Sequence, residues 1–452
     1  MQKIYNTKKE IFDEALLFME KCLLDVINQD DILEVKNEIE KNGRNRKGYL
    51  GQLVQKYVFN QELVDNRAEA DFKVAGVELK TTPIKEHKTK RYIAKERLVF
   101  SMIDYMTIIA ENWEESSFLE KNKLILLLFY LYKKELGILD YKFKFCYELD
   151  FLNNISNKDA VQIKKDWEYI VDKIKKGEAH LLSEGDTFYL GACTKASDSS
   201  VRRQQPNSEI PAKPRAFSLK QSYLNFIIQN EILSAHEDYK SISEENKTID
   251  EKIKDKLERF IGKTDNEIIE ELGLVINKKQ KQYKRTLANF MISGSNSKIE
   301  EFEKANVKLR VITLENNDNL KESISFPHFD YREIVNQDWE HSDLYRLFEE
   351  KRFLFVIFKK DKEGKSISFQ GWKFWNFPAF DMEEAQRIWE LNKEMIQSGK
   401  YDSLPKVSDS KIVHVRPHGR NRDDKIETPH GTMETKKCFW IHANYIKESL
   451  GL

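Results

Sequence analysis

The residues best suited to chemistry lie in residues 70–83, a short segment that contains Asp71, Glu78 and Lys80. Side chains alternate between the two faces of a strand, so Glu78 and Lys80 would point to the same side. Gly76 permits a turn that would bring Asp71 back alongside Glu78. Two carboxylates and an ammonium would then meet. This set suits phosphodiester hydrolysis, because the carboxylates can hold Mg²⁺, which lowers the pKa of a bound water, while the lysine orients that water or neutralises charge on the phosphate.

An acidic residue two positions before a lysine is common by chance and usually marks a solvated strand face. The context is what favours a site here. An acid lies seven residues before Glu78, a turn separates the two, and the apolar Val77 and Leu79 alternate with the polar side chains.

The chain also repeats itself, which indicates two homologous halves. A set of aromatic and acidic residues recurs in the same order and at a constant spacing: Phe100, Asp104, Tyr105, Trp113 and Glu114 are matched by Phe326, Asp330, Tyr331, Trp339 and Glu340. We therefore expect one domain over residues 1–228, a charged linker with helical character over 229–254, and a second domain over 255–452. The alternative is two unrelated domains of similar composition.

Each half mixes helical patterns with short β-rich runs, which predicts an α/β or α+β sheet domain built twice. The elements expected in the first half are a helix over residues 11–27, a strand over 74–80, a central strand over the apolar run 124–132, and a helix around Trp167 that Gly177 ends.

The second half keeps the apolar positions of the chemical segment and loses its carboxylates. The alignment places the following pairs opposite one another: Asp71 and Glu301, Glu78 and Lys308, Lys80 and Arg310. A cation at the central carboxylate position cannot ligate Mg²⁺, so we expect the second half to be a catalytically inactive copy.

Residues 48–54 and 71–83 together resemble the MutH family of mismatch-repair nicking endonucleases. The whole chain, both halves included, resembles the larger Sau-type restriction endonucleases that cut at GATC; further matches lie at residues 113–121, 189–196 and 214–220. The resemblance implies an α/β PD-(D/E)xK restriction-endonuclease-like fold, with a mixed sheet flanked by helices, duplicated in one chain. It also implies a catalytic core of Asp71, Glu78 and Lys80, with Lys121 as a further active-site lysine.

In this family a glutamate on the first helix assists the metal site, and the matching position here is Gln55. Its amide can offer a carbonyl oxygen but brings no charge. The resemblance therefore implies a Mg²⁺ site of Asp71, Glu78 and Gln55, with the nearby Glu62 as a possible substitute for the family's carboxylate.

For DNA recognition the resemblance implies a base contact from Lys195, which can donate to guanine O6 and N7. It implies another from Ser218, at a position where the family carries tyrosine; Arg215 and Lys220 lie in the same segment and are expected to contact DNA too. The alternative for Lys195 is an ordinary loop lysine on a phosphate.

The second half has a basic loop at residues 414–422 beside an aromatic pair at 439–440. Arg416, His418 and Arg420 favour a duplex-binding surface there, and the resemblance implies that this half binds a second copy of the site as an effector. The alternative is that the duplicate supports only the fold or a dimer interface. The histidines of this half have no spacing typical of a zinc site.

Together these features predict a Mg²⁺-dependent type II restriction endonuclease that cuts both strands of DNA and leaves 5′-phosphate and 3′-hydroxyl ends. Because one catalytic set is intact per chain, we expect dimerisation on DNA. A cognate DNA methyltransferase acting on the same site is the expected partner. The alternatives are a strand-nicking repair endonuclease and a non-cleaving site-specific DNA-binding regulator.

The 452 residues carry 75 Lys and Arg against 75 Asp and Glu, a net charge of zero. Nucleic-acid binders are usually basic, so we expect weak non-specific binding, with affinity focused on basic segments at residues 44–47, 85–97, 213–220, 278–285 and 414–422. The four cysteines are scattered, the N-terminus has no signal pattern, and the longest apolar run is too short to span a bilayer. We therefore expect a cytoplasmic protein without a membrane segment.

Overall fold

The computed structural model describes residues 3–42, 48–63, 69–152, 157–196, 198, 200–235, 238–242, 244 and 246–452. Its contacts divide the chain into two compact units. Unit 1 comprises Met1–His180, Tyr189–Asp238 and Ser243–Thr248, and unit 2 comprises Leu181–Phe188, Tyr239–Ile242 and Ile249–Leu452. Within the described ranges, no helix has the length and apolar character needed to cross a membrane.

Unit 1 contains a mixed sheet in the order β2-β1-β4-β5 and an antiparallel sheet in the order β3-β9-β6. In the mixed sheet, β1 and β4 run parallel, and each has an antiparallel neighbour on its other side. The strands of unit 1 are β1 (Glu78–His87), β2 (Arg91–Ala94), β3 (Leu98–Met102), β4 (Leu124–Leu131), β5 (Phe143–Asp150), β6 (Leu190–Thr194), β7 (Arg203–Gln205), β8 (Ser208–Ala212) and β9 (Arg215–Leu219). Its helices are α1 (Lys8–Phe18), α2 (Gln29–Asn42), α3 (Tyr49–Tyr57), α4 (Ser117–Asn122), α5 (Asn157–Lys175) and α6 (Gln221–Phe226), which continues as a π-helix (Ile227–Ile232).

The apolar strand β4 is the buried centre of the mixed sheet. Its residues 125–129 have no exposed surface, and it pairs with β1 on one side and β5 on the other. A strand that is buried on both faces reads as a continuous apolar run. The central strand expected over residues 124–132 is confirmed.

The N-terminal helical pattern is divided rather than continuous. α1 begins at a capping box, in which the Thr7 side chain accepts from the Glu10 N–H and Glu10 accepts from the backbone of Thr7. The helix ends at Phe18, and Glu20 adopts a left-handed conformation with φ 65°. The helix expected over residues 11–27 is therefore wrong in extent, because a left-handed residue breaks the helix while the apolar period continues.

The start of β1 also differs from the sequence expectation. Phe72 and Val77 form an isolated antiparallel bridge, and the residues between them turn, with Gly76 at φ 64°. The turn expected before Glu78 is confirmed, but it takes up most of the strand that we expected over residues 74–80, and β1 starts only at Glu78.

The end of α5 follows the sequence expectation. Gly177 adopts φ 75° just after the helix, and its N–H donates to the Ile174 carbonyl at 2.9 Å. A left-handed glycine is a common way to end a helix, because it has no Cβ to clash with the preceding turn.

Unit 2 contains the sheets β12-β14-β15 and β13-β19-β16, and the small pairs β10-β11 and β17-β18. Its strands are β10 (Tyr239–Lys240), β11 (Lys298–Ile299), β12 (Val307–Leu314), β13 (Ile324–His328), β14 (Arg352–Lys360), β15 (Ile367–Asn376), β16 (Val413–Pro417), β17 (Lys425–Glu427), β18 (Met433–Thr435) and β19 (Lys437–Ile441). Its helices are α7 (Ile249–Leu257), α8 (Asp265–Glu271), α9 (Tyr283–Ser293), α10 (Glu300–Ala305), α11 (Tyr331–Ile334), α12 (Asp343–Glu350), α13 (Met382–Gln397) and α14 (Ala443–Ser449).

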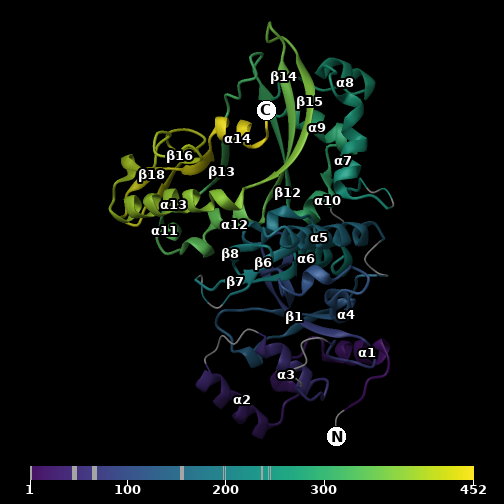
Figure 1. Ribbon diagram of the computed structural model, residues 1–452. Helices are drawn as coiled ribbons and strands as arrows, with labels where there is room; N and C mark the ends of the chain where they lie inside the picture. Colours follow the sequence, from purple (N-terminus) through teal and green to yellow (C-terminus); the bar gives the residue numbers. More distant parts are fainter. Residues whose placement is uncertain are drawn as a thin grey trace. The chain divides into compact units, whose positions relative to one another are not determined.

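Unit 2 repeats the topology of unit 1. β12 and β14 run parallel and β14 and β15 antiparallel, as β1, β4 and β5 do, and β13-β19-β16 repeats the antiparallel order of β3-β9-β6. In this parallel pairing Lys308 lies opposite Phe353, and in unit 1 Glu78 lies opposite Ile125. In Figure 1, α7, α8 and α9 flank the long β14–β15 pair on one side, and α13, β16 and β18 lie on the other.

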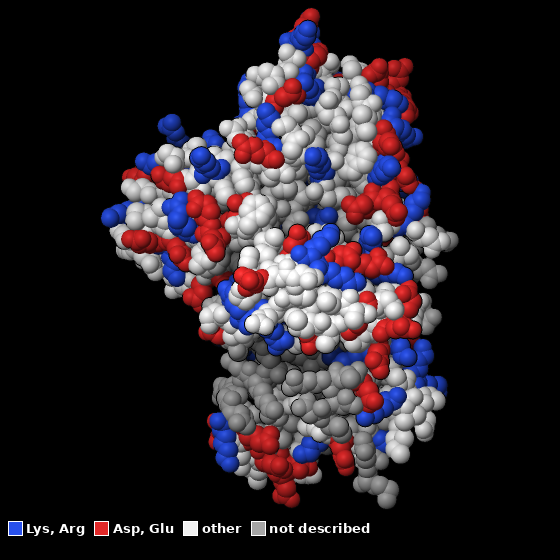
Figure 2. All heavy atoms as spheres, in the orientation of Figure 1, with Lys and Arg blue, Asp and Glu red and all other residues white. Residues whose placement is uncertain are grey.

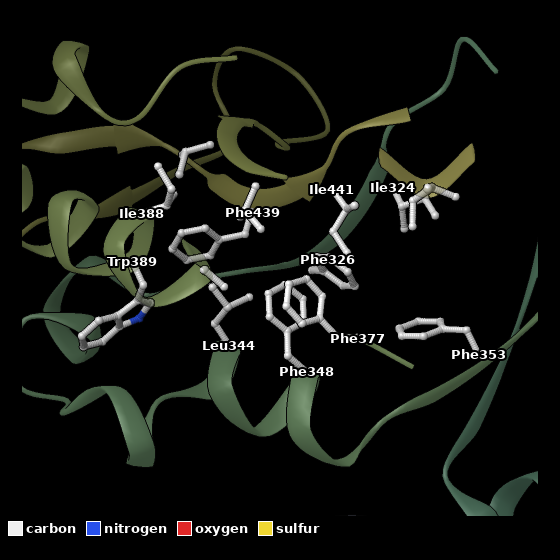
Figure 3. Close-up of a cluster of buried hydrophobic side chains, with 14 of the residues drawn as sticks. Ile324, Phe326, Leu344, Phe348, Phe353, Phe377, Ile388, Trp389, Phe439 and Ile441 are labelled. Atoms are coloured by element: carbon white, nitrogen blue, oxygen red, sulfur yellow. The ribbon is translucent and has the colours of Figure 1, made fainter. Parts of the chain in front are cut away.

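The core of unit 2 joins the second sheet to the helices (Figure 3). Phe348 on α12 stacks on Phe377 with ring centroids 4.0 Å apart, and Phe326 on β13 meets Phe348 edge to face at 5.5 Å. Trp389 on α13 is buried in the same cluster. Aromatic packing of this kind fixes α12, and with it the chain that enters β14.

Among its described residues, the stretch expected to link the two halves, residues 229–254, is helical only at its ends. It contains the last residues of the π-helix (Ile227–Ile232), the short strand β10, and the first residues of α7. β10 pairs in parallel with β11.

Candidate active site

Asp71 and Glu78 are held together by their own backbone. The Phe72–Val77 bridge folds the chain back on itself. Leu79 N–H then donates to Asp71 Oδ2 at 2.9 Å, and Asp71 N–H donates to Glu78 Oε2 at 3.2 Å. Each carboxylate is thus fixed by a peptide group next to the other, which sets both acids at the start of β1.

Two lysines from different elements meet Glu78. Lys80 Nζ lies 2.5 Å from Glu78 Oε1, and Lys121 Nζ lies 3.8 Å from the same oxygen. Lys121 comes from α4, a short helix that begins where the Ser116 side chain accepts from the Leu119 N–H. The three side chains are 3% (Glu78), 20% (Lys80) and 17% (Lys121) exposed, so the cluster is sheltered but reachable.

The electrostatics of the cluster are those of a buried acid between charges of both signs. Burial raises the pKa of the Glu78 carboxyl, Lys80 and Lys121 oppose that shift, and Asp71 adds to it. The structure thus brings Lys121 from α4 to Asp71, Glu78 and Lys80, which are neighbours in sequence.

The oxygen donors fit a hard divalent cation. Among the described residues, no group of three His, Cys, Asp or Glu side chains could hold a metal, so Asp71 and Glu78 would act as a two-carboxylate site. Mg²⁺ commonly binds through one or two carboxylates and takes its remaining ligands from water and substrate phosphate.

Gln55 and Glu62 belong to other segments of the chain than the residues of this cluster. Gln55 lies on α3, which packs against β1. One turn earlier on this helix, a Cβ added to Gly51 would lie 3.5 Å from Thr81 Oγ1. Glu62 is exposed in the segment after α3. Neither side chain forms a hydrogen bond or ion pair with the described residues of the cluster, and their part in metal binding stays a prediction.

The residues expected to contact DNA in unit 1 differ in burial: one is partly exposed and three are buried. Lys195 follows β6 and is partly exposed, and its N–H donates to the Pro214 carbonyl at 2.8 Å. Arg215 donates from Nη1 to the Ala192 carbonyl at 2.6 Å, and Arg215, Ser218 and Lys220 are each at most 5% exposed. β9 is the central strand of its sheet, so the structure does not place these three side chains at the surface.

The basic segment of unit 2 is at the surface only from Arg416 onward, because His414 at its start is buried in β16, and two of its exposed residues contact one tryptophan. The Arg416 guanidinium lies 5.2 Å from the Trp440 ring, and the His418 ring meets it edge on at 5.5 Å. Arg416, His418 and Arg420 are all exposed. Arg416 and His418 therefore share one accessible surface, and Arg420 is exposed in the same segment, while the basic segment at residues 44–47 lies outside the described residues.

The fold and the carboxylate–lysine cluster define a class of nuclease. The family model of the DNA mismatch repair enzyme MutH matches the chain twice, at residues 61–166 and 290–387. The first match contains Asp71, Glu78, Lys80 and Lys121, and the second contains β12 and β14 of unit 2.

The similarity extends to a whole protein. The chain is 31% identical over 499 residues to the type II restriction enzyme Sau3AI of Staphylococcus aureus, and the alignment covers 99% of both chains. The chain therefore belongs to the Sau3AI family of type II restriction enzymes, and the duplicated MutH-like fold expected from the sequence is confirmed.

Proposed function

We propose that unit 1 cuts DNA by Mg²⁺-dependent hydrolysis at the Asp71–Glu78–Lys80–Lys121 cluster. The observation that supports this best is the convergence of two lysines on a buried carboxylate that is tied to a second one. Mg²⁺ at the two carboxylates would polarise the phosphate and lower the pKa of a bound water.

The residues of the chain have distinct parts in this reaction. Lys80 would orient the attacking water, and Lys121 would offset the charge that develops on the phosphate oxygens. The water oxygen bonds to phosphorus while the bond to the 3′ oxygen breaks, and that oxygen takes up a proton. The products carry 5′-phosphate and 3′-hydroxyl ends.

A plasmid assay tests this activity. Wild-type protein should convert supercoiled DNA to linear DNA with Mg²⁺ and not with EDTA, and Asp71→Ala and Glu78→Ala should abolish conversion. Glu86→Ala is the matched control, because Glu86 is exposed on the same strand and has only a long ion pair, at 3.8 Å, with Lys133. Full cleavage by Asp71→Ala would contradict the assignment, and a stable nicked product at high enzyme would favour a strand-nicking enzyme.

For specificity we propose GATC, with Lys195 as a base-contacting residue. Lysine can donate to guanine O6 and N7 in the major groove, and the loop carrying Lys195 is anchored to the chain before β9. Sequencing the ends of digests of methylated and unmethylated DNA checks the site. Protection by methylation would support a cognate methyltransferase as partner in the cytoplasm, where the four free cysteines would stay reduced.

For unit 2 we propose a regulatory role, binding a second copy of the site and promoting cleavage at the first. Lys308 replaces the central carboxylate, and the exposed surface around Trp440 is basic. Because each chain holds one intact catalytic set, we further propose that two chains dimerise on DNA. A plasmid with two sites should be cut faster than a matched plasmid with one, and equal rates would contradict the effector role.

A further inference from the structure

The place in unit 2 that corresponds to the catalytic cluster is occupied by cations. Lys308 and Arg310 lie on β12, in the parallel pairing with β14 that β1 makes with β4. Lys351 follows α12 and directly precedes β14. In the repeat, these three residues stand at the positions of Glu78, Lys80 and Lys121, in that order.

These cations act on one another. Burial, and then the charges of Arg310, Lys351 and Arg285, lower the pKa of the Lys308 ammonium to about 8. Arg285 comes from α9, which packs against β12. Four positive side chains from three parts of unit 2 are thus near enough to repel each other. We call Lys308, Arg310, Lys351 and Arg285 the cationic cluster.

Little negative charge offsets the cationic cluster. Burial lowers the pKa of the Lys351 ammonium, Glu303 and Glu350 oppose that shift, and Arg310 adds to it. No ion pair joins any of the four cations to a carboxylate among the described residues. Lys308, Arg310 and Lys351 are half-buried and Arg285 is exposed. Taking a charge out of water without a partner costs free energy, so an anion from outside the chain would stabilise this arrangement.

Arg310 provides independent evidence for a missing acceptor. Its Nη2 donates to the Ser325 carbonyl at 2.9 Å, but its Nε is buried and has no hydrogen-bond partner among the described residues. Buried donors are nearly always paired in native proteins. An acceptor that also serves the neighbouring ammonium groups would be an anion with several oxygens.

The cationic cluster is close in the sheet to the exposed basic surface. Ser325 on β13, which accepts from Arg310, lies opposite Trp440 on β19. The Trp440 ring in turn contacts the side chains of Arg416 and His418. Cations therefore lie at both ends of a short path across β13 and β19, as a phosphate backbone that crosses several nucleotides would require.

We propose that the cationic cluster binds a phosphate of the DNA backbone directly, without a metal ion. In unit 1 a phosphate can approach two carboxylates only with a divalent cation between them, whereas in unit 2 Lys308 and Arg310 supply that positive charge themselves. Unit 2 then holds a duplex as a nuclease domain would, and cannot cut it. This inference rests on the proposed binding of a second site by unit 2.

The test uses the full chain with Glu78→Gln, which prevents cleavage, in EDTA, titrated with a fluorescent duplex containing the site. We expect two duplexes per chain. Adding Lys308→Met and Arg310→Met should weaken the second binding step by about tenfold or more, because two charge-assisted contacts are lost. Its dependence on salt should also fall by about one counterion per lost contact.

Controls separate a binding defect from a folding defect. Lys365→Met removes an exposed lysine of unit 2 that pairs with Glu363 and should leave both steps unchanged. Arg310→Lys, which keeps the charge, should retain most of the affinity. In the free protein the Lys308→Met variant should melt at the same or a higher temperature, because like-charge repulsion is relieved.

The outcomes distinguish the two proposals. If the parent binds a single duplex per chain, the effector role of unit 2 fails. If it binds two and neither step responds to Lys308→Met with Arg310→Met, the effector role stands and the cationic cluster proposal is overturned. Stabilisation of the cluster by inorganic phosphate with no change in duplex affinity would also overturn it, because the bound anion would then be free phosphate.

Discussion

Glu78 shows how a residue proposed to act in catalysis can oppose the stability of its own domain. Its side chain is 3% exposed, and burial, with Asp71, raises its pKa despite two nearby lysines. A carboxyl whose pKa is raised in the folded state holds its proton more tightly there than in the unfolded chain. Above the ordinary value of 4.5, ionised Glu78 therefore lowers the free energy of unfolding.

We predict that Glu78→Gln raises the melting temperature of the metal-free protein and lowers the cleavage rate by roughly 10²–10⁴-fold, a range typical of lost acid–base or charge stabilisation. The stability gain should be largest at neutral pH and shrink as the pH falls toward 4.5. Thermal unfolding in EDTA at several pH values measures it, with Glu86→Gln as the exposed control. A lower melting temperature would mean that the contacts with Lys80 and Lys121 outweigh burial.

His414 gives unit 2 a sensitivity to acid. It is fully buried, its ring lies 4.2 Å from that of His442, and neither of its nitrogens has a partner among the described residues. Burial first, then His442 and Arg416, lower its pKa from 6.5 to about 4. As the pH drops below about 6.5, His414 binds a proton in the unfolded chain but not in the folded protein, so the free energy of unfolding falls.

His414→Leu should reduce this loss. Urea unfolding at pH 7.5 and 5.5 should show a smaller difference between the two pH values in the variant than in the wild type. His341→Gln, at an exposed position of unit 2, should leave the difference unchanged. An identical pH dependence in His414→Leu and wild type would show that other groups cause the acid sensitivity.

At the scale of elements, the end of α5 depends on one glycine. Gly177 has φ 75°, and a Cβ on it would lie 2.5 Å from the Asn207 carbonyl oxygen, in the turn between β7 and β8. The Asn207 side chain also donates to the Lys175 carbonyl at 2.8 Å. The glycine therefore serves the helix end and the close approach of the β7–β8 turn.

We predict that Gly177→Ala lowers the free energy of unfolding by about 2–4 kcal/mol, the sum of an unfavourable φ and a steric clash. Gly48→Ala is the matched control: its φ is 87°, and no atom of the described residues lies within 4 Å of the added Cβ. It should cost about 1 kcal/mol. Equal losses in urea titrations of the two variants would show that the contact with Asn207 relaxes at no cost.

Local sequence patterns predicted that the residues of the proposed active site come together, but they did not predict that some of the expected DNA contacts are buried. Both results follow from how far apart in sequence the contacting segments are. Asp71, Glu78 and Lys80 are joined by a short turn, so spacing and strand alternation were enough to bring them together. The burial of Arg215 and Ser218 follows from β9 being the middle strand between β3 and β6, which depends on pairings with distant segments. The sequence repeat aligns Lys351 with Lys121. That Arg285 on α9 lies near the same cluster could be learned only from the packed structure.

At the scale of the molecule, zero net charge and DNA cleavage are compatible. On the face drawn in Figure 2, acidic and basic side chains are interspersed and do not form a field of one sign. On our proposals, specific binding then comes from local groups, namely the cationic cluster and the exposed basic surface around Trp440. Non-specific affinity, which depends on total phosphate neutralisation, should be weak.

We predict that double-strand cleavage depends more steeply on protein concentration than nicking does. With one intact catalytic set per chain, the second cut needs a second chain. Below one chain per site, nicked plasmid should accumulate first, and linear product should rise with about the square of concentration. Quantified gels over a dilution series measure this. A first-order rise of linear product would contradict dimerisation on DNA.

The pairing of β3 with β9 has a consequence for how the chain reaches its native state. Leu98 pairs with Leu219, so β3 must wait for its partner until nearly all of unit 1 has left the ribosome. Contacts between residues this distant in sequence slow folding and leave apolar strand edges open to aggregation. Because unit 2 repeats the order with β13 and β19, the chain passes through this exposed stage twice, and a slow synthesis rate or a lower growth temperature should increase the yield of native enzyme.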